Sequence, residues 1–131
     1  MAEAEKDTAT KKKIVFVIED DLFLIQAYQI KLEKEGVEIW TATNGKEALS
    51  FFDKGPANIV LLDLMLPGVN GFEFLTALKK NERWKNVPVI VLTNLSQPEN
   101  MKIAKDLGAV DYIVKAETKI NDVMERIKKY L

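Results

Sequence analysis

The chain has 131 residues and a mass of 14.9 kDa, which is the size of one globular domain. It contains no cysteine and no histidine, so disulfides, the common Cys/His zinc sites and catalytic arrangements that need an imidazole are excluded. Nineteen basic and twenty acidic residues give a net charge of −1, which argues against direct nucleic-acid binding because such proteins usually carry a strong basic balance.

The start of the chain differs from the rest in composition. Residues 1–12 are nearly all Ala, Thr and charged groups, and we interpret them as a disordered leader before one domain over residues 13–131. No apolar run approaches the ~20 residues of a membrane span, and the N-terminus has no apolar signal-peptide core. We therefore expect a cytoplasmic protein without membrane insertion.

Beyond the leader, short apolar runs alternate with longer stretches of helical period. The runs have the length and β-branched content of strands, and they are Ile14–Ile18, Val37–Ala42, Ile59–Leu62, Val89–Leu92 and Val110–Val114. The predicted helices carry Leu24, Tyr28 and Leu32 before Gly36, Ala48 to Phe52 after Asn44-Gly45, residues 71–81, the stretch from Pro98 to Gly108, and Ile120 to Leu131.

Five strands alternating with five helices indicate an α/β domain with a doubly wound, flavodoxin-like parallel sheet. The first, third and fourth runs are apolar throughout, as central strands buried on both faces should be. The second run alternates and the fifth carries Asp111 and Tyr112, so both suit the sheet edges. The simplest strand order is then 2-1-3-4-5, with one topological switch point between the first and third strands, where such sheets bind ligands.

Polar side chains end four of the five predicted strands, at the same edge of the sheet. They are Glu19 and Asp20 with Asp21 after the first strand, Asp63 after the third, Thr93 after the fourth and Lys115 after the fifth. Asp63 is the strongest signal, because it interrupts an apolar run from Leu61 to Leu66. A carboxylate in such a run is rare unless it is paired or binds a metal.

The acidic residues at the switch point predict a cation site. If Glu19, Asp20 and Asp63 converge at ~4 Å, each pair repels by about 4 kcal/mol at an effective dielectric constant of ~20. Lys115 alone does not neutralise three carboxylates, whereas a divalent cation would. Oxygen ligands without His or Cys indicate Mg²⁺, Mn²⁺ or Ca²⁺, and a small ligand set favours a hydrated Mg²⁺ that awaits a phosphate.

The chain from about residue 12 to residue 131 resembles the receiver domain of two-component response regulators. The resemblance rests on motifs in a fixed order and spacing, namely Val17–Asp21, Leu62–Gly68, Asn70-Gly71, Thr93 and Tyr112–Lys115. It implies that Asp63 is the phosphoacceptor, that Asp20 binds Mg²⁺ directly, with Mn²⁺ as an alternative ion, and that Glu19 acts mainly through water. The backbone carbonyl of Met65 would be the third protein ligand of the metal.

The resemblance also implies how the site works. Lys115 would hold the phosphoryl oxygens, Thr93 would turn toward the phosphate, and the rotamer of Tyr112 would follow. The phosphoryl group would come from a histidine kinase or a histidine phosphotransfer protein. An unknown downstream target would contact the face formed by the helix after Pro98, the strand 110–114 and the last helix.

The resemblance therefore implies a switch and not a turnover enzyme, because such a domain assists only its own phosphorylation and slow dephosphorylation. The first helix is expected to carry a kinase-docking flank of Leu22, Ile25, Gln26 and Gln29, which match docking positions of the family, although scattered surface apolar residues would give the same pattern. The chain ends with the last predicted helix, so we expect either a stand-alone receiver or a piece of a longer regulator.

Two residues near the site depart from the family's usual pattern. Ala116 stands where Pro is usual, and Asn94 stands where Ala or Gly is usual. A cis peptide before a non-proline residue costs roughly 2.5–4 kcal/mol, so we expect the Lys115–Ala116 peptide to be trans. By the same resemblance, Met65 and Leu95 would flank the approach of water to the phosphate. Neither side chain can orient a water strongly, so we expect a long-lived aspartyl phosphate, which Asn94 would partly offset if its amide pointed into the site.

Three other classes of protein share part of this sequence pattern. A haloacid-dehalogenase-type enzyme needs a second Asp two residues after the first, where this chain has Met65. A nucleotide or flavin binder needs a Gly-rich phosphate loop, and none follows a predicted strand. A receiver-like docking module that works without phosphorylation remains the alternative function.

Overall fold

The computed structural model describes residues 12–131, so residues 1–11 of the predicted leader lie outside the described residues. Five strands form one parallel sheet in the order β2-β1-β3-β4-β5, as predicted. They are β1 (Ile14–Ile18), β2 (Glu38–Ala42), β3 (Ile59–Leu62), β4 (Val89–Thr93) and β5 (Asp111–Val114). The strand order places the switch point between β1 and β3.

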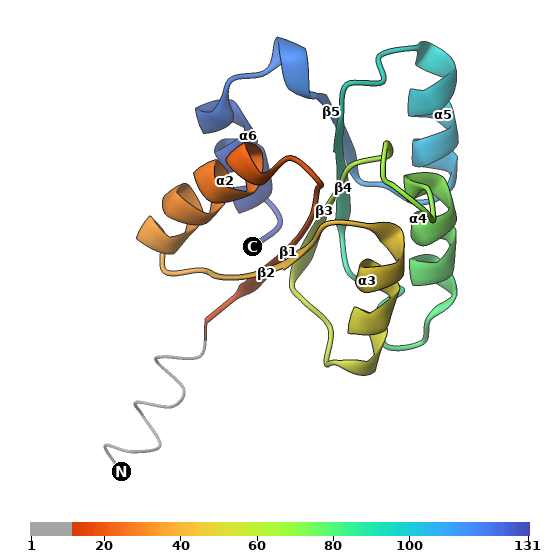
Figure 1. Cartoon of the computed structure of the whole chain (residues 1–131), viewed down its shortest axis with the longest axis horizontal. Helices are drawn as coiled ribbons and strands as arrows, with labels where there is room; N and C mark the ends of the chain where they lie inside the picture. Colours follow the sequence, from red (N-terminus) through yellow and green to blue (C-terminus); the bar gives the residue numbers. More distant parts are fainter. Residues whose placement is uncertain (1–11) are drawn as a thin grey trace.

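The helices form two layers around this sheet (Figure 1). They are α2 (Leu22–Lys34), α3 (Gly45–Ser50), α4 (Gly71–Lys80), α5 (Pro98–Asp106) and α6 (Ile120–Lys128), with 3₁₀ turns η1 (Phe51–Asp53) and η2 (Lys115–Glu117). Helices α2 and α6 cover one face, and α3, α4 and α5 cover the other. Among these helices, none has the combination of length and hydropathy that a membrane span needs.

The observed helix ends are close to the predicted ones, with two differences. The second helix, predicted through Phe52, ends at Ser50 and continues as a 3₁₀ turn, because Gly55 and Pro56 follow and do not extend a helix. The last helix ends at Lys128 rather than Leu131.

Local capping fixes where the helices that follow β1 and β3 begin. The Asp21 carboxylate accepts hydrogen bonds from the backbone N–H groups of Phe23 (2.9 Å) and Leu24 (3.3 Å) and so caps α2, which begins at Leu22, three residues after Glu19. Asn70 and Glu73 form a reciprocal capping box at the start of α4. These caps fix the loops between strand and helix, which are the loops that carry the polar residues.

The core has two halves, one on each face of the sheet. Strands β1, β3 and β4 alternate side chains between them, so that Phe16 packs in one half and Val17 in the other. Both side chains are at most 1% exposed. Central strands held from both sides have little freedom, and this gives the polar groups at their carboxyl ends fixed positions.

One predicted docking residue lies in the core. Ile25 was placed on the exposed flank of the first helix, but it is only 7% exposed and packs with Tyr28 and Leu32. Leu24, predicted to face the core, is half-buried at its margin. The reason is that an α-helix has 3.6 residues per turn. Spacings of three and four together keep Ile25, Tyr28 and Leu32 on one face, whereas repeated spacings of four from Leu24 rotate gradually away from that face.

Candidate functional site

Three carboxylates meet at the switch point of the sheet. Glu19 and Asp20 follow β1, Asp63 follows β3, and one carboxylate oxygen from each lies within 4.8 Å of the others. Glu19 and Asp63 are 2% and 4% exposed, whereas Asp20 is exposed to solvent. Two buried acids therefore lie beside one that solvent reaches.

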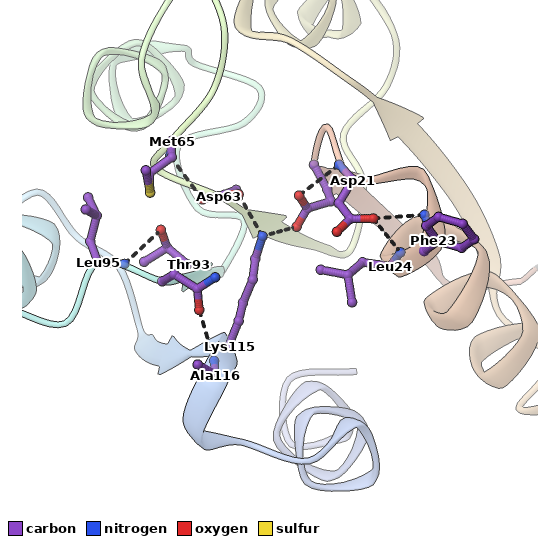
Figure 2. A network of polar contacts seen from close by, with 11 residues as sticks. Asp21, Phe23, Leu24, Asp63, Met65, Thr93, Leu95, Lys115 and Ala116 are labelled. Atoms are coloured by element: carbon purple, nitrogen blue, oxygen red, sulfur yellow. Dashed lines mark hydrogen bonds and ion pairs between the residues drawn. The ribbon is translucent and has the colours of Figure 1, made fainter.

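Lys115, the first residue after β5, reaches this cluster. Its Nζ lies 2.5 Å from Glu19 Oε1 and 2.7 Å from Asp63 Oδ2, and Figure 2 shows its extended side chain beside Asp63. Burial alone would lower the pKa of the Lys115 ammonium, but the hydrogen bonds from this group to Asp63 and Glu19 outweigh burial and raise that pKa. The lysine is thus held in its charged form between two acids.

The cluster keeps an excess of negative charge. Burial raises the pKa of the Glu19 carboxyl, although Lys115 and the backbone N–H of Asp21 favour its ionised form. Three carboxylates and one ammonium leave two negative charges when all are ionised. Close oxygen donors with this excess charge fit a hard divalent cation, and Glu19, Asp20 and Asp63 are the side chains that would hold it.

The loop after Asp63 is shaped around that side chain. The backbone N–H of Met65 donates to Asp63 Oδ1 at 3.0 Å, while the Met65 side chain is 55% exposed. Gly71, which opens α4, packs so closely that a Cβ there would lie 2.5 Å from the Leu64 Cα. Gly68 has a φ of +76°, in the left-handed region that glycine favours. The Asn70-Gly71 motif therefore lets α4 begin directly against the loop that holds Asp63.

Thr93 and Tyr112 are joined through the backbone of Leu95. Thr93 is fully buried, and its hydroxyl oxygen accepts a hydrogen bond from the Leu95 N–H at 3.4 Å. The half-buried Tyr112 donates its hydroxyl hydrogen to the Leu95 carbonyl at 2.7 Å. One peptide segment thus links the end of β4 to the side chain on β5, a connection that the sequence pattern did not indicate.

The residues predicted to dock a kinase on α2 border a depression in the surface. Leu22 is 67% exposed, Gln26 is exposed and Gln29 is half-buried, while Ile25 lies at the base. Phe23 also borders this depression and is 85% exposed, although the sequence analysis did not select it.

Two further contacts near the site were not indicated by the sequence pattern. Tyr28 was assigned to the core, and it is buried there, but it also lies near the acids: burial and then the charges of Glu19 and Asp63 raise its pKa. Asn94 Oδ1 accepts a hydrogen bond from the Ala116 N–H at 2.9 Å. None of the peptide bonds in residues 12–131 is cis, so the predicted trans Lys115–Ala116 peptide is confirmed.

A doubly wound parallel sheet with an acidic cluster and a lysine at its switch point defines a class of phosphate-handling signalling domains. The sequence profile of the response regulator receiver domain matches residues 15–128, and the chain belongs to this family.

Known relatives agree with this assignment. The uncharacterized transcriptional regulatory protein YkoG of Bacillus subtilis is 34% identical over 121 residues, which cover 92% of this chain and 52% of that protein. The chain thus spans about half the length of this curated relative. A CheY-like receiver domain protein from Methanospirillum hungatei has a TM-score of 0.83 at 28% identity, covering 91% of this chain and 93% of that structure. The Mn²⁺-bound form of response regulator Rcp1 has a TM-score of 0.78 at 25% identity, covering 89% and 90% of the two chains.

Binding of a divalent cation should stabilise the folded protein, because it relieves repulsion within the cluster. With Mg²⁺ near 100 times its dissociation constant, linkage adds about 2.7 kcal/mol to the free energy of unfolding and raises the melting temperature by roughly 10 °C. Thermal denaturation with and without Mg²⁺ measures this. Asp20→Asn should remove most of the shift, and Asp106→Asn, at an exposed acid on α5, should keep it. A melting temperature that ignores millimolar Mg²⁺ would count against the site.

Proposed function

We propose that this chain is a phosphorylation-activated switch that accepts a phosphoryl group on Asp63 from a partner histidine kinase or histidine phosphotransfer protein. Membership of the receiver family supports phosphorylation-dependent signalling in general. The observation that carries the proposal for this chain is the buried Asp63 carboxylate, bound by Lys115 at 2.7 Å and placed beside two further acids. A cytoplasmic location, where ATP-dependent kinases work, is part of the proposal.

The proposed transfer forms one bond and breaks another. A carboxylate oxygen of Asp63 attacks the phosphorus, the P–N bond of the donor phosphohistidine breaks, and the imidazole leaves with its electron pair. Lys115 neutralises charge on the phosphoryl oxygens, and the Met65 N–H holds the carboxylate in place. Mg²⁺, or Mn²⁺ in its place, would supply further charge neutralisation when bound by Asp20, Glu19 and the Met65 carbonyl. The chain returns to its first state by slow dephosphorylation, so it is not a turnover enzyme.

The output face is proposed to be α5–β5–α6. Phosphorylation would draw the Thr93 hydroxyl toward the phosphate, and Tyr112 would respond through its shared bonds to Leu95. Arg126 of α6 pairs with Asp111 of β5 at 2.5 Å, so a change at β5 reaches the neighbouring helix. We propose that a downstream protein partner binds this face, and that this domain does not itself bind nucleic acid.

Asp63→Asn should abolish labelling, because an amide is not a nucleophile toward phosphorus under these conditions. Wild-type protein incubated with Mg²⁺ and acetyl phosphate should give a hydroxylamine-labile phosphoprotein, measured by intact mass. Asp106→Asn, which changes an exposed acid on α5, serves as the control and should label like the wild type. Equal labelling of Asp63→Asn would refute the assignment, and an unlabelled wild type would favour a docking module that works without phosphorylation.

The kinase-docking surface is proposed to consist of Leu22, Gln26 and Gln29, with Ile25 beneath it. Leu22→Glu should slow phosphoryl transfer from a histidine kinase by roughly fivefold or more, since the side chain is exposed and apolar. Ile30→Glu, on the same helix and 57% exposed, is the matched control and should leave transfer unchanged.

Both of these docking variants should accept phosphate from acetyl phosphate at the wild-type rate. Ile25→Glu would instead bury a charge and lower the free energy of unfolding by several kcal/mol, which urea denaturation would detect. Equal loss of kinase and acetyl-phosphate labelling in Leu22→Glu would indicate damage to the fold rather than to docking.

The aspartyl phosphate is proposed to be long-lived, because Met65 and Leu95 offer no strong hydrogen bond to an attacking water. The side-chain oxygen Oδ1 of Asn94 accepts a hydrogen bond from the Ala116 N–H, which supports a long lifetime of the phosphate. In Met65→Asn/Leu95→Glu, decay of the purified phosphoprotein with Mg²⁺ should quicken by on the order of 10²-fold. Ile103→Asn, at an exposed position on α5, controls for nonspecific loosening. Unchanged decay in the double variant would disprove the water-access explanation.

A further inference from the structure

Asn94 and Ala116 lie just beyond the point where the β4–β5 ladder ends. The last residues paired across these strands are Thr93 and Val114. Asn94 is one residue beyond the ladder on the β4 side, and Ala116 is two residues beyond it on the β5 side. The side-chain oxygen Oδ1 of Asn94 accepts a hydrogen bond from the Ala116 N–H at 2.9 Å. This side chain therefore extends the connection between the two strands after the backbone ladder has stopped.

The donor of this bond belongs to the peptide that carries Lys115. The N–H of Ala116 lies in the planar peptide unit whose carbonyl comes from Lys115, so fixing the N–H fixes the orientation of that unit. Otherwise the segment is a single 3₁₀ turn, η2, closed by a long 3.4 Å hydrogen bond from the Thr118 N–H to the Lys115 carbonyl. The Asn94 bond is thus the shorter of the two constraints on this turn.

We propose that Asn94 is a positioning residue for Lys115: through the Ala116 N–H it holds the backbone from which the ammonium reaches Glu19 and Asp63. A lysine side chain has several rotatable bonds, so its end is placed well only if its backbone is fixed. This role rests on the proposed phosphorylation of Asp63. In that reaction, Asn94 would align Lys115 although Asn94 lies outside the acidic cluster.

The chemistry of both positions supports this pairing. A proline at 116 would have no N–H to donate, and a Gly or Ala at 94 would have no side-chain oxygen to accept it. The two positions where this sequence departs from the family's usual residues are therefore donor and acceptor of one hydrogen bond. Asn94 also follows Thr93 directly, so adjacent residues at the end of β4 contact both the Leu95 and the Ala116 backbone.

The hydrogen bond itself is tested on the unphosphorylated protein. In Asn94→Ala, the Ala116 amide should exchange with solvent roughly five- to tenfold faster than in the wild type, measured by NMR. Asn94→Asp keeps an acceptor oxygen and should restore slow exchange. Asn58→Ala is the matched control, because Asn58 makes the same kind of bond to the Ile14 N–H at 2.7 Å, at the start of β1.

The positioning role is tested by labelling with acetyl phosphate at saturating Mg²⁺. Asn94→Ala should label roughly three- to tenfold more slowly, the factor that corresponds to one ordinary hydrogen bond, with an unchanged Mg²⁺ dissociation constant. Asn58→Ala should label at the wild-type rate. In a Lys115→Met background, Asn94→Ala should cause no further loss, because the group that it positions is gone.

Each outcome decides a different point. If the Ala116 amide exchanges fast in the wild type, or if its exchange rate is the same in Asn94→Ala, the hydrogen bond is refuted. If Asn94→Ala changes the exchange rate but not the labelling rate, the positioning role is refuted. The same holds if Asn94→Ala lowers the labelling rate equally in the wild-type and Lys115→Met backgrounds. If the wild type accepts no phosphoryl group, the proposed function is refuted, and so is a role of Asn94 in phosphoryl transfer. The exchange measurement still tests the Asn94–Ala116 hydrogen bond independently.

Discussion

Mutual repulsion among Glu19, Asp20 and Asp63 is the constraint on which the site depends. Their carboxylate oxygens lie within 4.8 Å of one another, and two of the three side chains are almost fully buried. At about 4 Å and an effective dielectric constant of ~20, each pair of like charges costs about 4 kcal/mol. Lys115 offsets part of this repulsion, and the remaining negative charge favours a divalent cation. Phosphorylation of Asp63 is the further step in the proposed function.

The sheet is what forces these charges together. Strands β1 and β3 are paired and buried on both faces, so their carboxyl ends emerge at one edge and have little freedom to separate. The two halves of the core hold the strands from both sides, and the caps at α2 and α4 fix the starts of the helices that follow the two acidic loops. The packing energy of the core therefore holds the three carboxylates together against their mutual repulsion, as is common at functional sites.

The same strand ends connect the acidic cluster to a distant surface. Thr93 and Tyr112 both bond to the backbone of Leu95, and Asn94 bonds to the backbone after Lys115. A movement of Lys115 or Thr93 would therefore also move the backbone near Leu95, which leads into α5, and strand β5. In the proposed function, these hydrogen bonds and the short backbone segments between them would link the acids to the α5–β5–α6 face.

The sequence by itself determined the five strands, their order and the acids at their ends, because hydrophobic period and the rules of parallel-sheet connection depend on local pattern alone. It also singled out Asp63, since a carboxylate within an apolar run has few structural explanations. Only the tertiary structure decided that Ile25 rather than Leu24 enters the core, that Lys115 bridges Glu19 and Asp63, and that Asn94 meets Ala116. The Lys115 and Asn94 contacts join residues far apart in the chain that lie beyond strand ends, and side-chain direction there follows no period that a sequence pattern can reveal. The choice between Ile25 and Leu24 depended on how α2 packs against the sheet.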